Sequence, residues 1–144
     1  MPNAQSILEK KGADVATADR KATVLDTAKT MNQQRIGAVV VTDGERVVGI
    51  FTERDILNRV VATGKDPKTT PIGEVMTSPM ACCRRDTRIA ECKTVMSQKR
   101  IRHLPVVEEG KLYGMISAGD ILASEVTDQQ ATIEYLHEYL YGRR

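Results

Sequence analysis

Two short motifs, Thr52-x-x-Asp55 and Ser117-x-x-Asp120, each place a hydroxyl and a carboxylate three residues apart, where an apolar run meets a helical pattern. This spacing permits two kinds of chemistry. In a capping box, the hydroxyl accepts a hydrogen bond from a first-turn N–H while the carboxylate reaches back to the cap N–H. In a ligand site, the carboxylate can accept both hydroxyls of a ribose cis-diol, and the helix start favours an anion. The residues alone leave both interpretations open.

The two motifs belong to an internal duplication with an offset of 65 residues. Gly49–Leu57 returns as Gly114–Leu122, and nine of the 34 pairs between positions 24 and 57 are identical, without a gap. Repeats of this kind bury a shared core between the copies. We therefore expect the function to lie between them.

Composition limits the class of protein. The 144 residues suffice for one domain or for two half-domains that share a core. A net charge of +2, with no Trp and one Phe, is unlike a typical nucleic-acid binder. No run of about 18 apolar residues could span a membrane, and the N-terminus lacks the pattern of a signal peptide. We expect a soluble cytoplasmic protein.

The three cysteines are odd in number, and Cys82 and Cys83 are adjacent. This pattern argues against a disulfide framework or a CxxC metal pair, so we expect reduced thiols. The alternative is a redox-sensing vicinal pair, which only measured thiol reactivity would support.

Each copy is expected to fold as strand, helix, strand, strand, helix. Short extended segments at 14–17 and 79–82 precede helices whose apolar residues recur at helical spacing. Two β-branched runs then follow, joined in the first copy by a turn at Asp43-Gly44, which predicts a hairpin.

Three segments lie outside the copies. A short helix over 4–11 ends before Gly12, and a connector rich in Gly and Pro joins the copies. An amphipathic helix over 127–141 carries three of the four tyrosines. Its apolar stripe is expected to pack on its own domain, or else to form a subunit contact.

The duplicated unit, with its apolar run into Gly, a hydroxyl residue and Asp-Ile-Leu at the last helix, resembles the cystathionine β-synthase (CBS) domain. Two in tandem resemble the Bateman module, here a stand-alone one of bacterial type, over about residues 7–125. The resemblance implies an α/β (α+β) fold of two pseudo-twofold-related β-α-β-β-α repeats, with small sheets packed together and flanking helices. The expected divisions are an N-terminal helical segment, a first repeat, a connector, a second repeat and a C-terminal amphipathic helix at residues 1–14, 15–61, 62–79, 80–125 and 126–144.

The resemblance also implies that adenosine-containing ligands (AMP, ADP, ATP, S-adenosylmethionine or NADH) bind in two clefts between the repeats, as regulatory ligands and not as catalytic cofactors. The implied ribose contacts are Asp55 and Asp120, with the hydroxyls of Thr52 and Ser117. The implied adenine walls are Val15, Ala16, Thr17, Met80, Ala81 and Cys82, with Ile36, Gly37, Ile101 and Arg102. The implied phosphate contacts are Arg54, Arg102 and His103.

Two of these residues have plainer alternatives. Arg54 in a first helical turn opposes the helix dipole, so it either binds phosphate or forms a surface pair with Glu53 or Asp55. His103 is either a phosphate contact or a satisfied structural histidine. It has no second His or carboxylate at ligand spacing, so we expect no metal site.

The two clefts are not expected to be equal. Gly37 and Ala38 correspond to Arg102 and His103, and Gly119 stands where the first copy has Arg54. We expect the Asp120 cleft to gather Arg102 and His103, and the Asp55 cleft to gather Thr52, Arg54, Met80 and Ala81.

The sequence thus predicts a regulatory, energy-sensing CBS pair that forms a homodimer and signals to an effector protein. We expect no enzyme, because no nucleophile with an adjacent base, paired carboxylates or phosphate loop is present. Two alternatives remain. One is a structural or interaction dimer module with vestigial clefts. The other is a weak nucleic-acid-binding module, with salt-sensitive binding, that uses Arg84, Arg85, Arg88, Lys99, Arg100 and Arg102.

Overall fold

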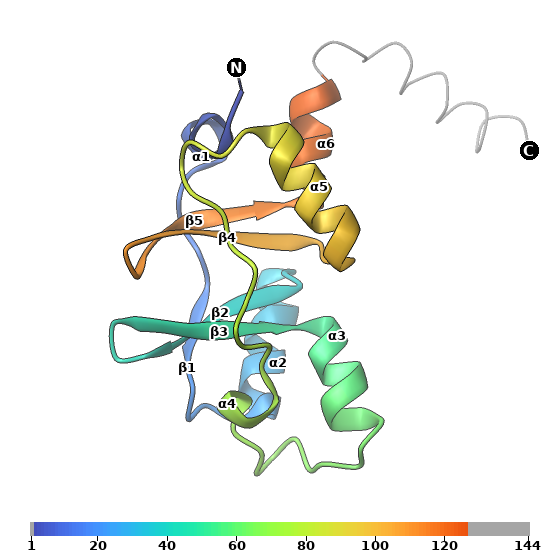
Figure 1. The fold of residues 1–144 in the computed structure, drawn as a ribbon. Helices are drawn as coiled ribbons and strands as arrows, with labels where there is room; N and C mark the ends of the chain where they lie inside the picture. Colours follow the sequence, from blue (N-terminus) through green and yellow to red (C-terminus); the bar gives the residue numbers. More distant parts are fainter. Residues whose placement is uncertain (1, 127–144) are drawn as a thin grey trace, which may run out of the picture.

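The computed structural model describes residues 2–126, and it shows two small β-sheets one above the other with helices beside them (Figure 1). The described part of the chain therefore has the mixed α/β architecture that the sequence predicts. In chain order the elements are α1 (Ala4–Lys11), β1 (Thr17–Asp19), α2 (Val24–Gln34), β2 (Ala38–Asp43), β3 (Arg46–Thr52), α3 (Glu53–Asp55), the π-helix η1 (Ile56–Val61), α4 (Ile72–Val75), α5 (Ile89–Lys99), β4 (His103–Glu108), β5 (Lys111–Ser117) and α6 (Ala118–Val126).

The duplication is confirmed in the backbone. The bounds of α2, β2 and β3 return, 65 residues later, as those of α5, β4 and β5. Both hairpins carry a register shift at the same point, after Val41 and after Val106. Both helices end on a left-handed residue, Arg35 or Arg100, each with φ of 55°.

The first strand of each copy differs from the prediction. β1 begins at Thr17, so the expected segment 14–17 overlaps it by one residue, and β1 pairs in parallel with β2. In the second copy the strand shrinks to a single parallel bridge between Cys83 and Val106. The prediction placed both strands about three residues too early because the apolar residues before them, such as Val15, pack between the sheets instead of pairing.

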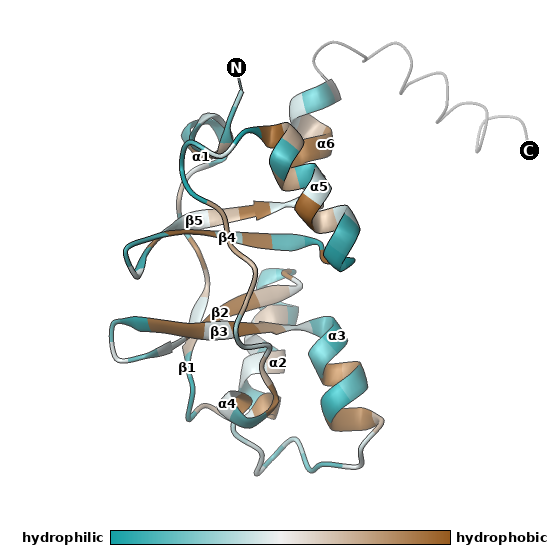
Figure 2. Ribbon diagram, viewed as in Figure 1, coloured by the Kyte–Doolittle hydropathy of each residue, from teal (hydrophilic) through white to brown (hydrophobic). Residues whose placement is uncertain are grey.

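Strands β2 and β3 are buried on both faces, which explains their nearly continuous apolar sequence (Figure 2). Val39 and Val41 point into a core under the helices of the first copy, while Ala38 and Val40 point toward the other sheet. Met115 of β5 joins that second set. The two sheets therefore pack together through an apolar layer.

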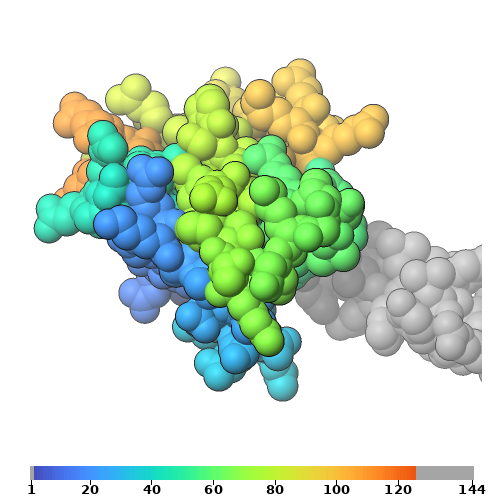
Figure 3. All heavy atoms as spheres, turned by 90° about the horizontal axis from the view of Figure 1, so that it is seen from below, coloured from blue at the N-terminus to red at the C-terminus, as the bar shows by residue number. Residues whose placement is uncertain are grey.

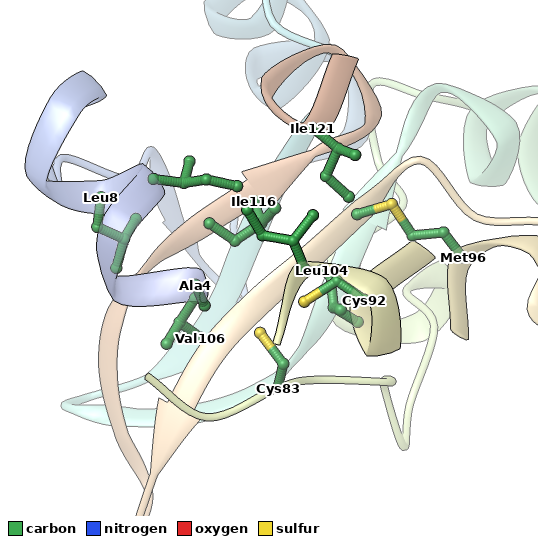
Figure 4. Packing of buried hydrophobic residues seen from close by; sticks show 11 residues of the cluster. Ala4, Leu8, Cys83, Cys92, Met96, Leu104, Val106, Ile116 and Ile121 are labelled. Atoms are coloured by element: carbon green, nitrogen blue, oxygen red, sulfur yellow. The ribbon is translucent and has the colours of Figure 1, made fainter. Parts of the chain in front are cut away.

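The second copy has its own core, which includes α1. Ala4, Ile7 and Leu8 pack with residues from α5, α6 and the second sheet (Figure 4). The α1 helix is confirmed over 4–11, with a capping box at Asn3 and Gly12 at its end. The N-terminal helix therefore belongs to the core of the second copy, although it precedes the first.

The connector packs on the first copy in the corresponding way. Met76 and Thr77 cross β3 at Gly49, where an added Cβ would lie 2.7 Å from the Met76 sulfur and 2.7 Å from the Thr77 carbonyl oxygen. At the equivalent Gly114 the crossing side chain is Leu8 of α1. Viewed from below, the connector lies between α2 and the helix over 53–61 (Figure 3).

The expected helix over 127–141 lies outside the described residues. Among residues 2–126, no helix combines the length and apolar character needed to cross a bilayer.

Candidate functional site

A cleft of about 640 Å³ opens between the two copies, where the start of α3 faces the end of α5. Its lining is partly apolar and partly charged, and both copies contribute to it. The residues that line it are Gly37, Ile50, Thr52, Glu53, Arg54, Asp55, Leu57, Thr77, Pro79, Ala81, Lys99, Arg100, Ile101, Arg102 and His103.

Asp55 lines this cleft with only 4% of its surface exposed. Its Oδ2 accepts from the N–H of Thr52 at 3.0 Å and from the Thr52 hydroxyl at 3.3 Å, and the Asp55 N–H donates to that hydroxyl at 3.3 Å. Its Oδ1 accepts from the Thr77 hydroxyl at 2.9 Å, with Arg59 Nε at 3.6 Å. The capping box is therefore formed, and the carboxylate is held in a fixed orientation.

Four cationic side chains surround the cleft, one from the first copy and three from the second: Arg54, Lys99, Arg100 and Arg102. Within residues 2–126, none of the four forms an ion pair with a carboxylate. These four cations outnumber the two carboxylates that also line the cleft, Glu53 and Asp55, so the cleft carries a net positive charge that attracts anions. The cleft is thus suited to a ligand with several negative charges.

Arg54 joins the two copies across this cleft. Its Nη1 donates to the carbonyl oxygen of Arg100 at 2.6 Å. Arg100 ends α5 in a left-handed conformation, so a positive charge at this point interacts favourably with the helix dipole. The surface pair expected between Arg54 and Glu53 or Asp55 is not formed.

His103 begins β4 and lines the same cleft. Burial lowers the pKa of His103 below its ordinary value, and the charges of Lys11 and Arg102 lower it further, while Glu53 and Asp120 oppose the shift. The imidazole is therefore neutral at pH 7. Gly37 permits the close approach of its neighbours here, because an added Cβ would lie 2.8 Å from Glu53 Oε1 and 3.4 Å from His103 Cε1.

The second copy of the motif has a different neighbour. Asp120 Oδ2 accepts from the Ser117 N–H at 2.8 Å and from Lys11 Nζ at 2.7 Å, and the Asp120 N–H donates to the Ser117 hydroxyl at 3.0 Å. Although burial opposes the shift, Lys11 and Ser117 hold the pKa of Asp120 below its ordinary value. Lys11 also donates to the Met115 carbonyl at 2.9 Å.

The structure gathers about half of the residues expected at a ligand site. Those that line the cleft are Gly37, Thr52, Arg54, Asp55, Ala81, Ile101, Arg102 and His103. Those that do not are Val15, Ala16, Thr17, Ile36, Met80, Cys82, Ser117, Gly119 and Asp120. Val15 and Met80 pack between the sheets, Ala16 and Ile36 pack on the core of the first copy, and Thr17 and Cys82 are exposed.

The structure places two of these residues differently from the expectation. Arg102 and His103 were expected in the Asp120 cleft, yet both line the cleft that contains Asp55. The reason is that α5 ends opposite the start of α3, so the residues that follow α5 face Asp55.

Several lining residues were not assigned to a ligand site from the sequence, among them Glu53, Thr77, Lys99 and Arg100. Lys99 and Arg100 were considered only as part of a nucleic-acid surface. Their place at a helix end, three and two residues before Arg102, was the available signal. Thr77 carried none, because it reaches Asp55 only through the packing of the connector.

No group of three His, Cys, Asp or Glu side chains within residues 2–126 could hold a metal ion.

The family model of the CBS domain matches this chain twice, over residues 9–62 and residues 72–126. The chain therefore belongs to the CBS-domain family, and it is a CBS pair of the regulatory kind. This agrees with the two-copy architecture and with the cleft between the copies.

Known proteins share this organisation. The solved structure of a protein with CBS domains from Burkholderia ambifaria is 37% identical and superposes with a TM-score of 0.84, covering 88% of this chain and 96% of that one. A hexameric CBS-CP12 protein from bloom-forming cyanobacteria is 32% identical, with a TM-score of 0.75 over 88% of this chain and 74% of that one. The mitochondrial CBS domain-containing protein CBSX3 of Arabidopsis thaliana is 34% identical over 125 residues, which are 83% of this chain and 61% of that relative's length.

Proposed function

We propose that this CBS pair is a sensor module that binds an adenosine-containing ligand with two or more phosphates, such as ADP or ATP, in the Asp55 cleft. The observation that carries the proposal is the gathering of four cations, none of them in an ion pair within residues 2–126, around a cleft that both copies line. A ligand held there touches both copies, so it can bias how they pack together.

The apolar part of the cleft suits an adenine ring. Ile50, Leu57, Pro79, Ala81 and Ile101 all line it. An aromatic base buried among such side chains gains free energy in proportion to the apolar area removed from water. Ala81 and Ile101 are also among the residues that the sequence assigned to an adenine wall.

Asp55 is placed to accept a ribose hydroxyl. Each carboxylate oxygen can accept two hydrogen bonds. Oδ2 already has two from Thr52, whereas Oδ1 has one from Thr77, with Arg59 beyond hydrogen-bond distance. Oδ1 therefore keeps capacity for a ligand hydroxyl without loss of the capping box.

The charge of the cleft separates the ligands that the family resemblance implies. ADP and ATP carry more negative charge at pH 7 than AMP or NADH, whereas S-adenosylmethionine carries a sulfonium cation close to its sugar. Placing that cation among the four basic groups of the cleft is unfavourable. We accordingly place ATP and ADP before AMP, and S-adenosylmethionine last.

Exposed apolar side chains support self-association of the module. Leu57 and Leu122, which occupy equivalent positions in the two copies, are 61% and 58% exposed, and Val61 is 65% exposed. The cyanobacterial relative is described as hexameric. We therefore include pairing of two copies in the proposal, with the ligand state read out by an effector protein.

The nucleic-acid alternative gains less support, because its basic residues do not form one open basic surface. Arg85 and Arg88 pair with Glu108 and Glu91. The remaining cations at 99–102 line the cleft instead of an open face.

A thermal-shift panel with ATP, ADP, AMP, NADH and S-adenosylmethionine tests the proposal. Ligand at about 100 times its dissociation constant adds about 2.7 kcal/mol to the stability of the folded state, so binding raises the melting temperature. The expected order is ATP and ADP above AMP, with no shift from S-adenosylmethionine.

Two variants locate the site. The double variant Lys99→Gln with Arg102→Gln should lose the shift, while the exposed Arg84→Gln, outside the cleft, should keep it. An equal loss of the thermal shift in the double variant and in Arg84→Gln would show that the shift depends only on the net charge of the protein. The absence of a shift with every nucleotide would contradict the proposal.

A further inference from the structure

We infer that the chain has one ligand site and not two: Asp120, the duplicate of Asp55, serves as the docking site of α1 through its ion pair with Lys11. This inference rests on the proposed function for the Asp55 cleft, but the Lys11–Asp120 contact can be tested without any ligand.

The first observation is the contact itself. Lys11 Nζ lies 2.7 Å from Asp120 Oδ2 and 2.9 Å from the Met115 carbonyl oxygen. Lys11 is the last residue of α1, and Asp120 lies 109 residues further along the chain. The carboxylate oxygen that accepts the Ser117 N–H therefore also pairs with a cation from another helix.

In the first copy the equivalent contact from another segment is made by a neutral side chain, and the cation beside Asp55 is Arg59 of its own helix, with Nε 3.6 Å from Oδ1. The connector residue Thr77 exchanges backbone hydrogen bonds with Ile50, the counterpart of Met115, and its hydroxyl donates to Asp55. In the second copy, the Lys11 ammonium takes the place of both the Thr77 N–H and the Thr77 hydroxyl. The same structural role is thus filled by a charge, which pairs with Asp120 directly.

The second observation concerns the cations that hold the phosphates in the proposed site. The residues at the equivalent positions of the other copy are Gly119 for Arg54, Gln34 for Lys99 and Gly37 for Arg102. Only Arg100 keeps a basic counterpart, Arg35. Three of the four positive charges are therefore missing around Asp120, so a polyphosphate has little to bind there.

The rest of α1 is fixed to the second copy, so the pair is part of a built interface. The Ala4 and Gln5 N–H groups donate to the Thr87 and Arg85 carbonyls, and Leu8 packs against Gly114. Lys11 completes this interface at its other end. Asp120 thus contributes to folding, whereas Asp55 contributes to ligand binding.

The test is the stoichiometry of ATP binding, measured by isothermal titration calorimetry on the wild type and on Asp55→Asn, Asp120→Asn and Lys11→Ala. We expect one ATP per chain. Asp55→Asn should weaken binding about tenfold or more, because it removes a charged acceptor. Asp120→Asn and Lys11→Ala should keep the wild-type affinity within about twofold, since neither residue lines the Asp55 cleft. Two ATP per chain, or a loss in Asp120→Asn equal to that in Asp55→Asn, would overturn the inference.

A ligand-free measurement separates this inference from the proposed function. Lys11→Ala and Asp120→Asn should each lower the melting temperature by roughly 2 to 4 °C, and the double variant should fall by less than their sum, because both changes remove one ion pair. Lys10→Ala removes the same charge from an exposed neighbour on the same helix and should leave the melting temperature unchanged. Additive effects of the two changes would overturn the docking role, whether or not ATP binds.

Discussion

The guanidinium of Arg54 caps the far end of a helix in the other copy: its Nη1 lies 2.6 Å from the carbonyl oxygen of Arg100, the residue that ends α5. This contact explains why an Arg is found in a first helical turn, where it opposes the dipole of its own helix. The same cation lines the proposed phosphate site. Because a guanidinium has five N–H donors, Arg54 can keep its contact with the Arg100 carbonyl and still donate to a ligand phosphate.

Replacing Arg54 with Ala should affect both roles. We expect a loss of about 0.5 to 1 kcal/mol in the free energy of unfolding, a small value because the side chain is exposed. ATP affinity should fall roughly tenfold, as expected for a lost charge-assisted hydrogen bond. Urea unfolding and calorimetry measure the two effects, with Arg84→Ala as the control. Unchanged ATP affinity would remove Arg54 from the site.

The two equivalent glycines should respond differently to an added methyl group. A Cβ at Gly49 meets the Thr77 carbonyl oxygen at 2.7 Å, which is backbone, whereas at Gly114 it meets only the flexible side chain of Leu8. Gly49→Ala should therefore cost about 2 to 3 kcal/mol and Gly114→Ala about 1 kcal/mol. Gly119→Ala, whose Cβ would lie 3.6 Å from the Ser117 hydroxyl, is the matched control. If urea unfolding gave equal losses in the free energy of unfolding for Gly49→Ala and Gly114→Ala, the connector backbone would have to move as easily as the Leu8 side chain.

The cysteines should differ in reactivity. Cys82 is exposed, whereas Cys83 and Cys92 are buried with their sulfur atoms turned toward each other (Figure 4). The hydrogen bond to Cys92 and burial raise the pKa of the Cys83 thiol above its ordinary value. The same hydrogen bond lowers the pKa of the Cys92 thiol, but Cys92 is fully buried and out of reach of a reagent. Because the thiolate is the reactive form and must be accessible, a disulfide reagent should modify one thiol per chain in the native protein and all three after unfolding. Rapid modification of both Cys82 and Cys83 in the native state would support the hypothesis of a vicinal redox pair.

His103 should make stability depend on pH. Its folded-state pKa is lowered, so the unfolded chain binds the proton more tightly, and stability falls as the pH drops through the unfolded value near 6.5. His103→Gln should flatten this slope between pH 7 and pH 5. A bound phosphate should raise the pKa of His103, which NMR titration of the imidazole can follow with and without ATP. An imidazole that titrates above 6.5 in the free protein would contradict this account.

The sequence predicted the backbone well and the cleft only in part. The gapless 65-residue offset determines the hairpins and helices, because apolar periodicity and turn residues act locally. Which residues of the second copy lie opposite Asp55 depends on how the two sheets pack together, and no local sequence pattern predicts this packing. Arg102 and His103 were therefore expected beside Asp120, although they line the cleft that contains Asp55, and the contacts of Lys11 and Thr77 could not be foreseen.

The capping motifs show the same limit. Thr52-x-x-Asp55 and Ser117-x-x-Asp120 are alike in sequence, and both form capping hydrogen bonds. What separates them is the third partner, Thr77 or Lys11, which arrives from a different segment of the chain. The two interpretations offered by the sequence are also compatible, since a capping carboxylate can keep an oxygen available for a ligand.

The most direct test of the central claim is NMR titration of uniformly ¹⁵N-labelled protein with ATP. Binding in the proposed cleft predicts that the largest amide shifts occur at Gly37, Thr52, Ala81 and Ile101, which line it, while the amides of Ser117 and Asp120 change little. Largest shifts around Asp120, or no saturable shifts at all, would contradict the account.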